Sequence, residues 1–152
     1  MGNGTYTDST IPVAVRGLSS VVAIAGGDSQ SLAIKNSDST PPVIAGMPKA
    51  GYTLWPVDGK LVTVAIVTAS DALSGLAPGS FKVTGTSNEP DPRYSDIVIT
   101  PNESGGFVVQ LRAARWGHAN DRIYTLTATA SDLAGNTASA TGTCTVPHDQ
   151  GK

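Results

Sequence analysis

Apolar and polar residues alternate with a period of two along the last third of the chain. In residues 122–130, every second position from Tyr124 to Ala130 is apolar, and threonines fill the positions between them. Residues 137–146 repeat this alternation with small side chains. Such a pattern predicts strands that have one buried and one solvated face. Residues 132–136, with the sequence DLAGN, contain Gly and Asn where a positive φ costs little, so we predict a long hairpin.

Shorter alternating or apolar runs predict further strands before this hairpin. In the body of the chain they are residues 43–44, 61–69, 81–86, 96–100 and 107–113. Near the N-terminus, short runs bounded by Gly, Ser or Asp occupy residues 11–15, 21–25 and 31–34. With the hairpin, the strands of the body reach the number typical of an immunoglobulin-type sandwich. The predicted fold class is all-β, an immunoglobulin-like antiparallel β-sandwich of about seven strands with an N-terminal extension of short β-strands.

The body is separated from the N-terminal runs by a stretch with no apolar period. Residues 36–42 read NSDSTPP, and the two consecutive prolines favour an extended backbone. The predicted parts are a strand extension over residues 1–36, a linker over 37–42, the sandwich over 43–147 and a polar tail over 148–152. The sandwich part is long enough to bury one core.

Composition narrows the classes of partner. The 152-residue chain has 17 glycines, 10 prolines and few aromatic residues, which is typical of many short strands joined by turns. Its formal net charge is -2 and the charges are scattered singly, which argues against nucleic acid as a partner. The longest apolar run, residues 61–67, is interrupted by Thr63 and is too short for membrane insertion. The single cysteine, Cys144, excludes an internal disulfide.

Five short motifs follow one another in the N-terminal segment. They are NGT at 3–5, PV at 12–13, GLS at 17–19, VVAIAGG at 21–27 and SLA at 31–33. On these motifs the segment resembles one repeat of the RCC1 β-propeller family. It departs from that family at Gln30, where a histidine is usual, and it lacks the Trp-Gly turn that normally follows. A single propeller repeat cannot cover its own hydrophobic face, so we expect it to pack on the sandwich, on another subunit or on further repeats.

The body carries a second set of motifs. They are DSTPP at 38–42, LWP at 54–56 with Lys60, ASD at 69–71, LRA at 111–113, YTLTATASD at 124–132 with GN at 135–136, and VPHDQ at 146–150. On these motifs the body resembles bacterial extracellular immunoglobulin-like domains. The resemblance implies a stalk unit or terminal module and brings no enzymatic residues. Residues 2–10 are polar and form no leader, so we expect a mature form or a fragment of a secreted or cell-surface protein.

Two aspartates, Asp71 and Asp132, follow predicted strands and could offer oxygen ligands at one pole of the sandwich. Calcium needs several such oxygens together, and the further candidates are Asp38, Glu89, Asp91 and Asn136. The family resemblance implies a calcium-stabilised linker near Asp38. The competing interpretation is that each aspartate accepts backbone N–H bonds within its own turn. No Asp-x-Asp-x-Asp-Gly run occurs, which favours this second interpretation.

A candidate binding segment lies between two of the predicted strands. Exposed Trp and Arg anchor many interfaces, so Arg115, Trp116 and His118 are candidates for contacting a protein partner or a glycan. The competing interpretation is a solvated turn. Trp55 is predicted to plug one end of the core, because the body has few aromatic residues with which to fill it. The alternative is a carbohydrate-stacking role for Trp55 or Trp116, in a platform that Tyr52 and Tyr94 could join.

Candidates for catalysis are weak. No serine lies in a Gly-x-Ser-x-Gly motif, and Cys144 is predicted to face the core, where a thiol stays protonated. Glu89 and Asp91 lie in a proline-rich turn, where solvent keeps carboxylates ionised and unfit as general acids. We therefore expect a protein that is not an enzyme.

These patterns favour a non-catalytic extracellular structural or interaction module, such as a filament or pilus-associated subunit. Strands that have no partner in the sequence invite edge pairing, with another copy or with another protein. The candidate pairing positions are Val13, Val15, Val22 and Ile24. The alternative is a glycan- or ligand-binding accessory module of a larger secreted protein.

Overall fold

The computed structural model describes residues 3–16, 18, 21–28, 30–35, 38–117 and 120–148. Within these ranges the secondary structure consists of strands, and no helix occurs. The strands are β1 Val21–Gly26, β2 Ser31–Lys35, β3 Val43–Ala45, β4 Tyr52–Thr53, β5 Leu61–Ser70, β6 Lys82–Ser87, β7 Ile97–Pro101, β8 Phe107–Arg112, β9 Arg122–Ser131 and β10 Thr137–Val146. The chain divides into two compact units, Met1–Ser39 and Thr40–Lys152. No helix in the described part of the chain has the length and apolar character needed to cross a membrane.

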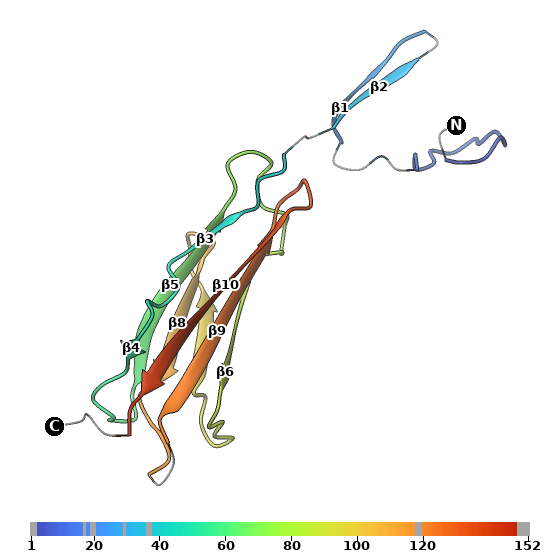
Figure 1. Cartoon of the computed structure of the whole chain (residues 1–152). Helices are drawn as coiled ribbons and strands as arrows, with labels where there is room; N and C mark the ends of the chain where they lie inside the picture. Colours follow the sequence, from blue (N-terminus) through green and yellow to red (C-terminus); the bar gives the residue numbers. More distant parts are fainter. Residues whose placement is uncertain are drawn as a thin grey trace. The chain divides into compact units, whose positions relative to one another are not determined.

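The larger unit is a sandwich of two four-stranded sheets (Figure 1). One sheet has the strand order β4-β10-β9-β6 and the other has the order β3-β5-β8-β7. Neighbouring strands are antiparallel, except that β4 pairs with β10 in parallel. The predicted all-β fold class is confirmed. The seven strands predicted in the body are found with small shifts at their ends, whereas β4, which has two residues and no period, was not predicted.

Alternation along β9 and β10 builds one wall of the core. The inward positions of β9, from Arg122 to Ala130, are all buried, as the threonine-separated pattern predicts. On β10 the predicted phase is correct, but only Cys144 and Val146 are fully buried, and the inward positions before them are half-buried. The opposite wall comes mainly from β5 and β8, and Leu54 is buried in the same core.

A β-bulge interrupts the pairing of β5 with β8. Thr63 pairs with Gln110 and Ala65 pairs with Val109, so Val64 has no partner across the ladder. The extra residue shifts the phase of the strand, which is why two consecutive side chains, Val64 and Ala65, are both buried. Each half of β5 thereby keeps an apolar row on the core side, Val62 and Val64 before the bulge and Ala65 and Val67 after it.

The smaller unit contains an antiparallel hairpin of β1 and β2, in agreement with the strands predicted at residues 21–25 and 31–34. Every residue of β1 is exposed, and β2 has one half-buried residue. The third strand predicted here, at residues 11–15, is wrong. Pro12 has no N–H for a ladder, and Ser9 Oγ donates to the Ile11 carbonyl at 2.7 Å in a local turn.

Candidate functional site

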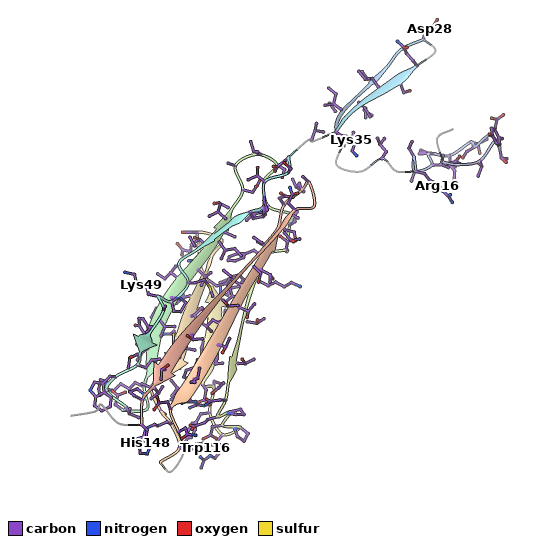
Figure 2. The ribbon with its side chains drawn as sticks, viewed as in Figure 1. Arg16, Asp28, Lys35, Lys49, Trp116 and His148 are labelled. Atoms are coloured by element: carbon purple, nitrogen blue, oxygen red, sulfur yellow. The ribbon has the colours of Figure 1, made fainter. Side chains whose placement is uncertain are left out.

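One pole of the sandwich carries a pocket of about 400 Å³. The end of β6, the start of β7, the end of β8 and the start of β9 meet at this pole because β6 pairs with β9 and β7 pairs with β8 in antiparallel register. The loops beyond these strand ends supply most of the lining, and Figure 2 shows Trp116 from this region. The lining residues are Gly59, Asp91, Arg93, Tyr94, Asp96, Arg112, Ala114, Arg115, Trp116 and Arg122.

Arg122 forms the floor of this pole and is only 2% exposed. Its guanidinium donates to the Asp96 carboxylate and to the Glu89 carbonyl. It also donates to Ser87 Oγ at 3.0 Å and to the Ala114 carbonyl at 2.9 Å. A buried cation needs such partners, because burial without them is costly. Arg122 therefore ties the loops after β6 and β8 to the first residue of β9.

The wall of the pocket is a layer of guanidinium groups around the ring of Tyr94. The guanidinium carbons of Arg93 and Arg112 lie 5.7 and 5.3 Å from the ring centre. Arg93 is paired with the Asp91 carboxylate at 2.8 Å, and Arg112 Nε lies 3.5 Å from Asp96 Oδ1. Cation–π contacts of this kind hold an aromatic ring in place while leaving it open to solvent, and Tyr94 is 58% exposed.

Arg115 and Trp116, two of the predicted binding residues, lie at the rim of the pocket. The Arg115 guanidinium donates to the Trp116 carbonyl at 3.3 Å and to the His148 carbonyl at 2.8 Å. The Trp116 main-chain N–H donates to Glu89 Oε2 at 3.0 Å. The Trp116 side chain is 50% exposed. These bonds link Arg115 and the backbone of Trp116 to neighbouring segments, and the role of Arg115 and Trp116 in binding stays a prediction.

Trp55 is not among the residues that line the pocket. His118 lies outside the described residues. Trp55 is 54% exposed, so the prediction that it plugs the core is wrong. The neighbouring residue, Leu54, lies in the core instead. Its N–H donates to the Thr145 carbonyl at 2.8 Å. A second hollow, of about 580 Å³, lies next to His148 and Ile123, and the described residues that line it include no arginine.

The predicted metal ligands lie at another part of the chain. Asp71 and Asp132 belong to the sandwich unit, whereas Asp38 belongs to the smaller unit. Within the sandwich unit, Asp71 Oδ1 accepts the N–H of Gly75 at 2.7 Å and two further main-chain N–H groups of its own turn. Asp132 accepts the main-chain N–H and the side-chain amide of Asn136 at 2.8 and 2.7 Å. The hydrogen bonds of Asp71 and Asp132 are those of turn capping.

The hairpin residues predicted to pair with a partner are exposed. Val22 and Ile24 lie on β1, and Ile24 is 80% exposed. Val13 and Val15 are also exposed, but they belong to the segment that forms no strand here, and pairing with a partner through them stays a prediction. Among the four predicted pairing positions, Val22 and Ile24 lie in a strand that could accept a neighbour.

Three titratable side chains of the sandwich, Asp91, Tyr124 and Cys144, have pKa values far from neutral pH. Hydrogen bonds from Arg93 lower the pKa of Asp91 to about 2. Burial raises the pKa of Tyr124 to about 12 and that of the Cys144 thiol to about 11. A general acid or base needs a pKa near the working pH, so none of these three groups is suited to proton transfer there.

A comparison with known protein families and with curated proteins gave no match to this chain. Most of the pocket was not predicted from the sequence, although Arg122 carried a signal. It occupies an inward position of the β9 alternation, so a buried acidic partner was required. Nothing in the sequence shows that Asp96, in a loop before β7, is that partner.

Proposed function

We propose that this chain is a non-catalytic extracellular interaction module that joins a partner through its N-terminal hairpin. The observation that carries the proposal is the exposure of apolar side chains on both faces of β1 and β2. A two-stranded hairpin is marginally stable in water unless further strands or another surface cover it. The function that the hairpin supports best is therefore association with a partner that covers these side chains.

The register of the hairpin shows how the two faces are composed. Ile24 lies opposite Ala33, whereas Leu32 lies opposite Ala25 and Ile34 lies opposite Ala23. Because cross-strand partners share a face and successive residues alternate, Ile24 lies on one face and Leu32 and Ile34 lie on the other. All three large side chains are exposed. Each strand also keeps one edge unpaired within its two-stranded sheet, and such an edge can add a strand from another chain.

The sandwich supports the extracellular module part of the proposal. Strands β3, β5, β8 and β7 form one sheet, and β10, β9 and β6 lie together in the other. When these seven strands are taken in chain order, they divide between the two sheets as the strands of constant-type immunoglobulin domains do. The Tyr124 hydroxyl near the start of β9 donates to the Arg112 carbonyl at 2.8 Å, which resembles the tyrosine corner of such domains. Modules of this kind serve as rigid units in surface and secreted proteins.

Light scattering coupled to size-exclusion chromatography tests the proposal. We expect the whole chain to associate as its concentration rises, and a chain of residues 40–152 to stay monomeric. Ile24→Asp should weaken association, because it places a charge on one apolar face of the hairpin. Ile66→Asp is the matched control, since Ile66 is an exposed isoleucine on β5 of the sandwich.

A monomeric whole chain at every concentration would contradict self-association. If the amides of β1 and β2 were also protected from hydrogen exchange in that monomer, the hairpin would be covered within its own chain, and the proposal would be wrong.

A further inference from the structure

The pocket of about 400 Å³ at the pole of the sandwich has more positive than negative charge. Four arginines line it, against two aspartates. Asp91 is paired with Arg93, and Asp96 is paired with Arg122. Arg112 shares Asp96 at the longer distance of 3.5 Å, and Arg115 donates only to carbonyl oxygens among the described residues.

Excess guanidinium charge of this kind favours an anion. Arg112 and Arg115 each direct N–H donors to neutral carbonyl oxygens, which leaves their positive charge only weakly compensated among the described residues. Guanidinium groups match carboxylate and sulfate groups in geometry, because two parallel N–H donors can face two oxygens. The pocket therefore offers a site for an anionic group beside Arg112 and Arg115.

The same pocket exposes two aromatic rings, Tyr94 and Trp116. The Tyr94 ring is held by contacts with the guanidiniums of Arg93 and Arg112, and the main-chain N–H of Trp116 donates to Glu89. Rings that are already positioned lose little conformational entropy when a ligand packs on them. An aromatic ring accepts the C–H edges of a sugar on its face, and its polar edge stays wet.

We propose that this pocket binds an acidic saccharide, a sugar ring that carries a carboxylate or a sulfate. The ring packs on Tyr94 or Trp116 and the anion lies against Arg112 and Arg115. An apolar peptide is less suited to the pocket, because Ala114 is the only aliphatic side chain among its lining residues. The residues of this site differ from those of the hairpin, so failure of the inference would leave the proposed association untouched.

Isothermal titration of the whole chain with an oligogalacturonate tests the inference. A neutral galactose oligomer of the same length and sodium sulfate are the two comparison ligands. We expect the acidic oligomer to bind about tenfold more tightly than the neutral one, and more weakly as salt is raised, since exposed charge pairs are screened. Trp116→Ala and Tyr94→Ala should each weaken binding about tenfold, the loss typical of an aromatic anchor.

Trp55→Ala is the matched control, because Trp55 is as exposed as Trp116 and does not line the pocket. It should leave the affinity unchanged, and the urea midpoints of all three variants should confirm that each is folded. Absence of binding, equal binding of the neutral oligomer, or unchanged affinity in Trp116→Ala and Tyr94→Ala would overturn the inference. Sulfate alone binding as tightly as the oligomer would show a free-anion site and would overturn it as well.

Discussion

Removal of the Asp96 carboxylate is the sharpest test of how the pole of the sandwich is stabilised. In Asp96→Ala, Arg122 loses its carboxylate partner and Arg112 loses the oxygen that lies 3.5 Å from its Nε. The Asp91 N–H also loses its acceptor, Asp96 Oδ2, at 3.1 Å. Arg122 keeps only neutral oxygens as partners, with no room to reach water, because it is 2% exposed.

The expected cost follows from that burial. Removing one partner of a buried ion pair lowers the free energy of unfolding by about 3–5 kcal/mol, because the remaining charge stays buried and uncompensated. This is a large part of the roughly 5–15 kcal/mol that stabilises an ordinary domain. With a urea m-value of about 2 kcal/mol per molar, the unfolding midpoint should fall by about 2 M.

Urea unfolding followed by tryptophan fluorescence measures this change. Asp58→Ala is the matched control, because Asp58 also pairs with a cation, Lys60 at 2.9 Å, but does so at the surface. Its midpoint should move far less, since solvent screens an exposed pair. Equal midpoint shifts in Asp96→Ala and Asp58→Ala would show that the Arg122 pair is not held as a buried charge, and the reasoning would be wrong.

Three further predictions concern the sandwich. Cys144 should react with a thiol reagent only on unfolding, and fast labelling of the native protein would contradict its burial. Because its folded pKa of about 11 exceeds the ordinary thiol value of 9.0, stability should fall as pH rises from about 9 to 11. Gly46→Ala should lower the urea midpoint more than Gly59→Ala. Both glycines have a positive φ, but only at position 46 would the added Cβ lie 1.9 Å from a backbone atom, the Ile66 carbonyl oxygen. Equal midpoints of the two variants would refute the clash. Added calcium should leave the melting temperature unchanged within about 1 °C, because carboxylate oxygens of Asp71 and Asp132 already accept N–H bonds. A rise of several degrees would indicate a bound ion.

The strands that could be predicted are those whose pattern is local. Alternation fixes the inward face of β9 from Tyr124 onward, and the DLAGN turn at 132–136 fixes its hairpin with β10. Residues 11–15 show the limit of this reasoning. An apolar run becomes a strand only when a neighbour completes its ladder, and a neighbour is a property of the whole fold.

The candidate site was harder to predict because its residues are distant in sequence. Asp96 and Arg122 are 26 positions apart, and nothing in the loop before β7 shows that it folds over the first residue of β9. Arg115 and Trp116 were predicted from residue type alone, and Tyr94 only as a further aromatic. Trp55 was predicted to be buried because the body has few aromatic side chains, whereas aliphatic side chains and Tyr124 fill most of the core.

Because of the bulge at Val64, the effect of deleting one residue from β5 depends on where the deletion falls. Deleting Val64 would leave Val62, Ala65 and Val67 at every second position, so the shortened strand would present an unbroken inward row. Deleting Thr68 would instead reverse the facing of whichever half of the strand had to slide. Natural variants that differ by one residue in this strand should therefore differ at position 64, where the sheet already accommodates a residue that its neighbour does not match.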